Sequence, residues 1–472
     1  MPEAILNKAR DPQFPDYAYA ARMLVKVYEQ QSGEKALANL FLGEWVKVLD
    51  EKISEQARIH VRYRGGEGYV EPADLTRTRH LEIFFIDVRQ GDGILIQTPE
   101  DRRILIDAGE FDDTYEFIRN KYRLDKPKNY IDFDAIIATH SDADHTRGLF
   151  KILADPKIAV KRFYHNGLFR REDDQQDPGP HEGNRVFGLV DRPKETEIPA
   201  LTSDMKKLIA AIDKAEENLP IVIKKMEELG RRVDAPQEGF VCKRLDAAGR
   251  FLPPYDNPQN PMVIEVLWPQ ATMQDGKPSY PWYGNAGRTV NGNSVVLCVR
   301  HGNHRVLLTG DLNTDAMDDL LKIYPAGAGA PSPLESHVYK AAHHGSQDFS
   351  VPFLQTVKPD AAVISSGDDR NDIYGHPRAV LLGTITRYSR CEKPAVFSTE
   401  LAACFTRLTK DEQAEFKAGD AQLYERSIQG IIHFRSNGDE FYLGSVYGRK
   451  ASADPLANTL WKWDLWPQED SE

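Results

Sequence analysis

One short segment of the chain concentrates side chains that bind metal ions. Residues 139–148 read Thr-His-Ser-Asp-Ala-Asp-His-Thr-Arg-Gly and place two imidazoles, His140 and His145, close to two carboxylates, Asp142 and Asp144. A short apolar run that predicts a buried strand comes directly before them. Such groups are costly to bury unpaired, but neutral imidazoles and ionised carboxylates are good ligands of divalent cations. The segment therefore predicts a metal site on the loop after this strand; the alternative is a solvated polar loop rich in His and Asp.

Four other segments place possible ligands directly after predicted strands. They lead to Asp311 in Leu-Thr-Gly-Asp, to His343 and His344 in Ala-His-His-Gly-Ser, to His376 in Tyr-Gly-His-Pro, and to His165 in Arg-Phe-Tyr-His. Each is weak by itself, because a lone histidine is more often structural than a ligand. Loops that follow strands are, however, where a rigid scaffold positions functional groups. Their recurrence predicts one metal site assembled from distant stretches of the chain.

Together these motifs resemble the metallo-β-lactamase fold and, within it, the soluble ComEC-like branch, whose membrane relatives act in DNA uptake. The segment Asp87-Val-Arg-Gln-Gly-Asp92 is similar to the Asp-Val-Gly-Gln-Gly-Asp loop of that branch. Arg89 departs from it by replacing the usual glycine, which can alter the loop but removes no ligand. The resemblance covers about residues 81–445. It implies an α/β fold, a four-layer αββα sandwich with the metals at one edge.

The resemblance also implies two divalent metal ions and a ligand set for each. The ligands expected at the first metal are His140, Asp142 and His165, and those expected at the second are Asp144, His145 and either His343 or His344. Asp311 is expected to bridge the two metals. A plain strand-end histidine is the alternative for His165. Because Asp142 stands where many relatives have a histidine, the site is rich in oxygen ligands, and both Zn²⁺ and Mn²⁺ suit it.

Two cations roughly 3.5–4 Å apart lower the pKa of a water molecule and stabilise negative charge that develops on a substrate. In this interpretation Asp144 orients the nucleophile as well as binding metal. His376 is the candidate to protonate the leaving group or to contact a phosphate. A purely structural turn is the alternative for His376.

The rest of the chain must position these groups, and its pattern changes near residue 80. Earlier residues read as short strands with turns, and residues 17–75 resemble a bacterial SH3-like barrel; a helical cap over Tyr17–Gln31 is the alternative. Later residues alternate strands and helices, as in a layered α/β domain. The expected division is an SH3-like domain at 1–79, a catalytic domain at 80–447 with an insertion at about 166–261, and a tail at 448–472.

Smaller patterns predict local structure within the catalytic domain. Inside the insertion, Ser203–Gly230 carries apolar residues at helical spacing, with a break expected near Pro220. The turns at His301–His304 and Asn437–Asp439 each separate two strand patterns and predict hairpins.

The composition is that of a folded protein. Its length of 472 residues is enough for two or three domains. Hydrophobic residues make up 41% and charged residues 28%, which is too apolar for a disordered chain. No apolar run approaches the ~20 residues that span a membrane. The beginning of the sequence does not resemble a secretory signal, and the four cysteines form no CxxC pair. We therefore expect a cytoplasmic protein that does not bind membranes.

The leading functional hypothesis is a metal-dependent hydrolase, a phosphodiesterase or nuclease that acts on DNA or RNA. The net charge of −12 argues against a general nucleic-acid coat, although metal ions can supply positive charge locally. The first alternative is a small-molecule hydrolase, for a lactone, β-lactam, phosphorylcholine ester or nucleotide signal, with the insertion as a lid. The second is an adaptor whose SH3-like module recruits a protein partner. Tryptophans in the tail could stack bases or dock onto the core.

Overall fold

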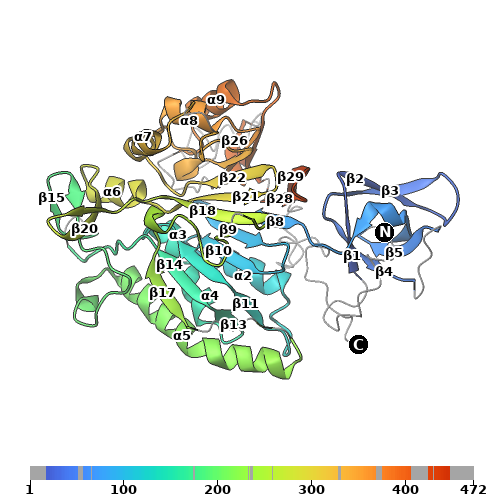
Figure 1. Cartoon of the computed structure of the whole chain (residues 1–472), viewed down its shortest axis with the longest axis horizontal. Coiled ribbons are helices and arrows are strands. Elements are labelled where there is room, and N and C mark those ends of the chain that lie inside the picture. Colours follow the sequence, from blue (N-terminus) through green and yellow to red (C-terminus); the bar gives the residue numbers. More distant parts are fainter. Residues whose placement is uncertain are drawn as a thin grey trace, which may run out of the picture.

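The structure is a computed structural model. It describes residues 17–50, 57–64, 66–173, 176–231, 233, 238–257, 259–327, 331–367, 375–405, 424–428 and 430–446. The expected C-terminal tail, with Trp461, Trp463 and Trp466, lies outside these residues. Two large sheets form the centre of the catalytic part, with helices on their outer faces (Figure 1).

The first sheet has eight strands in the order β17-β14-β12-β10-β9-β8-β28-β29. Their bounds are β8 (Leu81–Phe85), β9 (Gly93–Gln97), β10 (Arg103–Ala108), β12 (Ala135–Ala138), β14 (Arg162–His165), β17 (Val241–Arg244), β28 (Ile431–Ser436) and β29 (Phe441–Val446). Strands β10, β12, β14 and β17 are parallel, so their carboxyl ends meet at one edge. The remaining neighbours pair antiparallel.

The second sheet has six strands in the order β18-β21-β22-β23-β24-β25. Their bounds are β18 (Met262–Trp268), β21 (Val296–His301), β22 (His304–Leu308), β23 (Val338–Lys340), β24 (Ala361–Ile364) and β25 (Ala395–Ser398). From β22 to β25 the strands are parallel. Loops after β22 and β23 therefore lie together at one edge of this sheet.

Alternating side chains explain why the sheets are covered on both faces. In β9, Ile94 and Ile96 belong to the core between the sheets, whereas Leu95 packs with the helices outside. In β22, Leu308 likewise faces the other sheet and Leu307 the outer helices. Since successive residues of a strand point to opposite faces, a continuous apolar strand has to be buried on both. The predicted αββα sandwich is confirmed.

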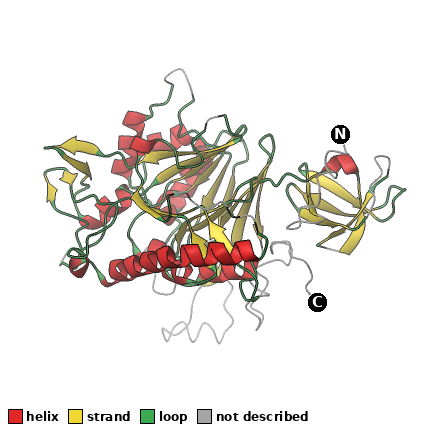
Figure 2. Ribbon diagram, turned by 60° about the horizontal axis from the view of Figure 1, so that its bottom comes forward, coloured by secondary structure: helices red, strands yellow, loops and turns green. Residues whose placement is uncertain are grey.

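Two groups of helices form the outer layers (Figure 2). The first sheet is covered by α2 (Asp113–Lys121), α4 (Leu149–Ala154) and α5 (Ser203–Glu228), and the second by α7 (Thr314–Ile323), α8 (Val351–Val357) and α9 (Ala379–Tyr388). The smaller elements are β11 (Ile131–Phe133), α3 (Ala143–Thr146), β13 (Ile158–Val160), β15 (His181–Glu182), β16 (Arg185–Val186), β19 (Thr272–Gln274), β20 (Lys277–Pro281), α6 (Ala286–Gly292), β26 (Glu400–Phe405) and β27 (Tyr424–Ile428). Among the helices that the structure describes, none is long and apolar enough to cross a membrane.

The N-terminal part forms a separate seven-stranded antiparallel sheet, at the right of Figure 1. Its strands are β1 (Tyr17–Ala20), β2 (Leu24–Tyr28), β3 (Ala36–Phe41), β4 (Trp45–Val48), β5 (Ile59–Tyr63), β6 (Gly66–Val70) and β7 (Leu75–Thr76). In β2, Val25 and Val27 are buried and alternate with exposed side chains, which is a strand period. The expected all-β segment is confirmed, and the helical alternative is wrong. Its finer likeness to an SH3-like barrel stays a prediction.

The expected insertion contributes to the sandwich itself. Helix α5 packs Met205 and Leu208 into the outer core of the first sheet, and β17 pairs with β14 and forms the edge of that sheet. The break expected near Pro220 does not occur, because α5 runs unbroken through that residue. Proline costs roughly 3 kcal/mol inside a helix. Apolar residues are buried on both sides of it, from Met205 to Met226, and this packing outweighs the local cost.

The two predicted hairpins are confirmed, and their tips touch. The Ser436 hydroxyl, in β28, lies 3.1 Å from His301 Nδ1 and 2.8 Å from His304 Nδ1. Asn303 N donates to the Gly438 carbonyl oxygen at 2.8 Å. One hairpin belongs to each sheet, so these contacts fasten the two sheets to each other at the edge of the sandwich.

At the amino ends of the parallel strands, a buried ion pair stabilises the first sheet. Lys161 Nζ lies 2.7 Å from Asp134 Oδ1, and the Tyr255 hydroxyl donates to Asp134 Oδ2 at 3.0 Å. Burial acts to raise the pKa of Asp134, but the Lys161 ammonium outweighs it and holds that pKa below its usual value. The folded pKa is thus lower than the unfolded value of about 3.9, so the carboxylate stabilises the fold above that pH, and the stabilisation is lost as the pH falls through the folded pKa.

We expect Asp134→Asn to lower the free energy of unfolding by about 1.5–3 kcal/mol at pH 7, because it removes one of the two carboxylates that pair with the buried Lys161, while Asp132 Oδ2 stays 2.8 Å from Lys161 Nζ. The difference from the wild type should shrink as the pH falls below about 4 and vanish below the folded pKa of Asp134, where the wild-type carboxyl is neutral as well. Urea unfolding at the two pH values measures this. Asp213→Asn is the matched control, since its partner Arg192 and the carboxylate itself are exposed; it should cost less than about 1 kcal/mol. Equal losses at the two positions would contradict the prediction.

Candidate metal site

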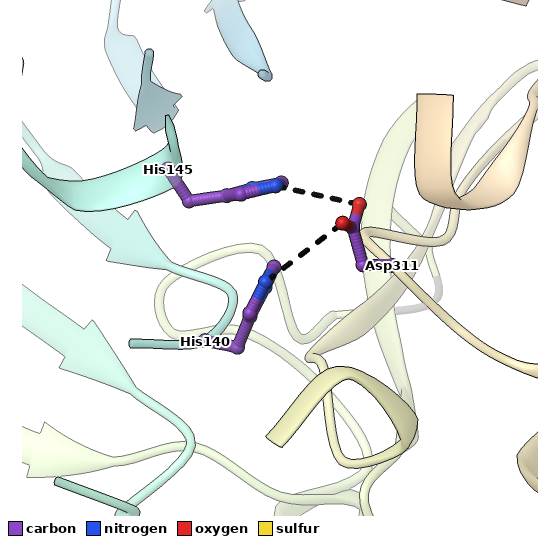
Figure 3. Close-up of side chains that lie close together, drawn as sticks. All are labelled: His140, His145 and Asp311. Carbon is purple, nitrogen blue, oxygen red and sulfur yellow. Dashed lines mark ion pairs between the residues drawn. The ribbon is translucent and has the colours of Figure 1, made fainter. Parts of the chain in front are cut away.

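The candidate site lies where the two sheets present their strand ends to each other. His140 follows β12, and His145 lies in the short helix α3 that comes after it. Asp311 follows β22 of the other sheet. Figure 3 shows both imidazoles pointing toward the Asp311 carboxylate, His140 from a loop and His145 from a helix. The two strand-end motifs, which are far apart in the sequence, are thus brought together.

The ligand atoms form a compact cluster around Asp311. His145 Nε2 lies 3.3 Å from Asp311 Oδ1, and His140 Nε2 lies 4.0 Å from Oδ2. His344 Nε2 is 3.2 Å from Asp311 Oδ2 and 3.4 Å from Asp144 Oδ2. Three imidazoles and two carboxylates therefore meet at one place, with Asp311 in contact with ligands on both sides.

Two overlapping triads within this cluster could each hold a cation. The first comprises His140, His145 and Asp311, and the second comprises Asp144, His145 and His344; in each, the ligand atoms lie within 4.8 Å of one another. His140 Nε2 is buried and has no hydrogen-bond partner among the described residues. A buried nitrogen without a partner costs free energy, and a metal ion would satisfy it. The residues present fit a metal centre.

The electrostatics of the cluster also suit cations. Burial acts to raise the pKa of Asp311, but His344 and His145 outweigh it and hold that pKa well below its usual value. Burial acts to lower the pKa of His344, yet the Asp311 charge outweighs it and raises that pKa to about 10. Burial, followed by the charge of His145, holds the pKa of His140 well below its usual value, so His140 is neutral. His140 is therefore ready to bind a cation as a neutral imidazole, whereas a cation bound at His344 would displace a proton from it.

The two adjacent histidines differ in position because the backbone turns sharply between them. His343 and His344 both have positive φ, 48° and 51°, which is uncommon for residues other than glycine. The His344 imidazole is buried, and its Nδ1 lies 3.0 Å from the Ser365 carbonyl oxygen, which leaves Nε2 facing the cluster. The His343 side chain is 30% exposed, and its Nε2 is 3.9 Å from Asp311. The geometry favours His344 where the sequence left both open.

A glycine is required where the Asp87–Asp92 loop approaches the site. Gly91 has φ +118°, and a Cβ there would lie 2.1 Å from the Asp144 carbonyl oxygen. Arg89, two residues earlier, adopts φ 66° although it has a side chain. The arginine therefore keeps a glycine-like backbone conformation in this loop.

Comparison with known proteins identifies the family. The model of the Metallo-beta-lactamase superfamily matches residues 86–368, more than half of the 472-residue chain. The chain belongs to the metallo-beta-lactamase superfamily. The matched segment contains both triads of this metallo-beta-lactamase site, from His140 to His344. The fold and the candidate metal ligands thus belong to one superfamily of metal-dependent hydrolases.

The relatives compared with this metallo-beta-lactamase chain share little sequence identity with it. ComE operon protein 3 of Bacillus subtilis (strain 168) is 24% identical over 328 residues, which are 65% of this chain and 31% of that protein. The chain thus spans about a third of that curated relative. Among solved structures, a protein of Parabacteroides distasonis ATCC 8503 assigned as a metal-dependent hydrolase has 13% identity and a TM-score of 0.27 (72% of this chain, 96% of that one). CmlA, a diiron β-hydroxylase from Streptomyces venezuelae, has 10% identity and a TM-score of 0.32 (69% and 54%). Neither score adds to the fold assignment.

The structure does not bring His165 into the metallo-beta-lactamase cluster. Its Nε2 lies 2.7 Å from the Asp191 carbonyl oxygen, and its Nδ1 accepts from Gly167 N at 3.0 Å. Both ring nitrogens are therefore used within the protein, and burial lowers the pKa of the ring to about 4. The expectation that His165 binds the first metal gives way to its alternative, a structural histidine at a strand end.

Two further predicted residues lie beside the cluster. Asp142 Oδ2 is 3.8 Å from His140 Nε2, but Asp142 belongs to neither triad. The His376 ring centroid lies 5.7 Å from that of His343. Burial, followed by the charges of His343 and His344, lowers the pKa of His376 to about 4, so its imidazole is neutral near pH 7. A neutral imidazole is a weak proton donor, and its role toward the leaving group stays a prediction.

The sequence analysis did not predict the residues that orient the candidate metal ligands of this metallo-beta-lactamase chain. Asp107 Oδ2 lies 2.8 Å from His145 Nδ1 and accepts from the Thr139 hydroxyl at 2.6 Å, which orients the imidazole. Lys340 is buried against Asp92 and donates to the Gly310 carbonyl oxygen at 3.1 Å, next to Asp311. A signal for Asp107 was present, because a carboxylate also ends the apolar strand Ile-Leu-Ile-Asp.

Proposed function

We propose that this chain is a metal-dependent phosphodiesterase that cleaves nucleic acid. The observation that carries the proposal is the convergence of His140, His145 and His344 with Asp144 and Asp311 at the facing edges of two sheets. The ComEC-like motifs and the match to ComE operon protein 3 support a DNA or RNA substrate over a lactone or β-lactam.

In this proposal the ligand set divides between two cations. His140 and Asp311 would hold the first, and Asp144, His145 and His344 would hold the second, with Asp311 in reach of both groups of ligands. When bound, two divalent cations would lower the pKa of a water molecule and stabilise negative charge that develops on the substrate. Asp107 fixes His145, and Ser365 fixes His344, so that each presents Nε2 to the cluster. Two carboxylates and three imidazoles suit either Zn²⁺ or Mn²⁺.

The N-terminal sheet is proposed as a contact site for a protein partner. It has its own apolar core, built around Val25, Val46 and Val61, and is therefore a separate structural unit. Such a role is compatible with catalysis by the sandwich.

The test is a cleavage panel with the full chain loaded with Zn²⁺ or Mn²⁺. It contains single- and double-stranded DNA, RNA, a cyclic dinucleotide, bis(4-nitrophenyl) phosphate and a lactone. Cleavage of DNA or RNA, abolished by Asp144→Ala, supports the proposal. An intact nucleic acid together with a hydrolysed lactone or cyclic dinucleotide would assign the chain to small molecules instead. Metal content near zero after loading would favour the adaptor.

A further inference from the structure

A positively charged side chain stands next to the candidate metal cluster without being part of it. Arg170 lies in the loop after β14, and its Nε and Nη2 contact Asp142 Oδ1 at 2.7 and 2.6 Å. The other oxygen of Asp142 is 3.8 Å from His140 Nε2. A single carboxylate therefore separates the guanidinium from the cluster.

Both oxygens of Asp142 have donors nearby in the same chain. Besides the two contacts of Arg170 on Oδ1, the Asn291 amide, when oriented with its NH2 toward Asp142, donates to Oδ2 at 3.1 Å and to the Gly287 carbonyl oxygen at 3.2 Å. The Asp142 carboxylate is thus held from α6 on one side while it holds Arg170 on the other. This arrangement is typical of a carboxylate that orients an arginine.

Arg170 has one guanidinium nitrogen, Nη1, that is not used in the contact with Asp142. Its side chain is 15% exposed, and its Nη1 makes no hydrogen bond to any residue that the structure describes. A guanidinium carries five N–H groups in a fixed fork, and here only one side of that fork is used. Arg147, in the same loop as the ligands, is by contrast paired with both Glu110 and Asp204.

The position of this charge points to an anionic ligand. Asp142 neutralises the Nε and Nη2 side of the guanidinium, so Nη1 is left with donors for another negative group. Cations held at the cluster would attract the same negative group, because charges interact strongly in a largely buried place. We infer that Arg170 binds a non-bridging phosphate oxygen of the substrate through Nη1, and that Asp142 is the residue that positions it. The inference rests on the proposed function, because the phosphate oxygen belongs to the phosphodiester substrate of that reaction.

The first experiment measures inorganic phosphate binding to the metal-loaded full chain by calorimetry. Arg170→Gln should keep the metal content of the wild type and raise the Kd for phosphate at least about tenfold, the loss typical of a hydrogen bond to a charged group. Arg170→Lys keeps the charge without the fork and should show a smaller loss; it also serves if glutamine disturbs folding. Arg192→Gln is the matched control, since Arg192 pairs with Asp213 and Glu216 on α5. An Arg170→Gln protein that binds phosphate like the wild type would overturn the inference.

The second experiment separates positioning from metal binding at Asp142. Asp142→Ala should retain the metal content of the wild type while weakening phosphate binding, because Arg170 loses its anchor. Loss of one metal equivalent would identify Asp142 as a ligand and would overturn its positioning role. Metal content is measured by elemental analysis after dialysis, so this readout does not depend on turnover.

These outcomes also distinguish the inference from the proposed function. A wild type that cleaves phosphodiesters while Arg170→Gln binds phosphate normally refutes the role of Arg170 alone. A wild type that cleaves no phosphodiester, together with weakened phosphate binding in Arg170→Gln, refutes the proposed reaction and leaves the anion site standing.

Discussion

Asp311→Asn is expected to reduce hydrolysis by at least about 10³-fold and to lower the metal content to one equivalent or less. Loss of an outer partner of a ligand already costs about 10–100-fold, and Asp311 lies within 4.0 Å of ligand nitrogens on His140, His145 and His344. Asparagine preserves the size of the side chain but removes the charge that two cations require. Activity on the substrate found in the panel and elemental analysis of the protein are the two measurements.

Asp315→Asn is the matched control for that variant. Asp315 lies in the following helix α7, where its carboxylate is 56% exposed and pairs with Arg288 at 2.8 Å. It should retain the metal content and activity of the wild type. A metal content that stays at the wild-type level in Asp311→Asn would contradict the central place given to this carboxylate.

The second large effect separates His344 from its neighbour. His344→Ala should remove one metal equivalent and reduce hydrolysis by about 10³-fold, because His344 Nε2 is the nitrogen that contacts both Asp144 and Asp311. His343→Ala should keep both metals and lose less than about tenfold, since the His343 side chain is 30% exposed and belongs to neither triad. The same two measurements apply. If His343→Ala lost the metal and His344→Ala kept it, the assignment would be reversed.

Much of the architecture could be predicted because it depends on local patterns. The Ile-Leu-Ile run of β9 and the Val-Leu-Leu run of β22 are apolar on both faces, which requires a layer on each side. The recurrence of His and Asp residues directly after predicted strands, among them His140, His145 and Asp311, was enough to predict one shared metal site. The four-layer sandwich and the division of the ligands between two metals came from the family resemblance.

The remainder depends on contacts that no local pattern contains. Which of His343 and His344 faces the cluster is set by two backbone turns with positive φ. Both ring nitrogens of His165 form hydrogen bonds, one with the Asp191 carbonyl oxygen and one with Gly167 N. Helix α5 tolerates Pro220 in its interior because the helix is packed along its length. Likewise, only the folded chain shows that Asp142 meets Arg170. Each of these depends on tertiary packing, which competes with and here outweighs local preference.

The order in which the chain contributes strands to the two sheets affects how it can fold during its synthesis. Strand β28 pairs with β8, so the first sheet cannot be completed before residues near the C-terminal end of the described chain have been synthesised. The triad of Asp144, His145 and His344 likewise cannot form until His344 has been synthesised, long after His145. Non-local pairings of this kind form slowly, and partly made chains expose apolar strands meanwhile. A complete ligand set is therefore present only after His344 has been synthesised, and until β28 follows, the apolar strand β8 lacks one of its two neighbours.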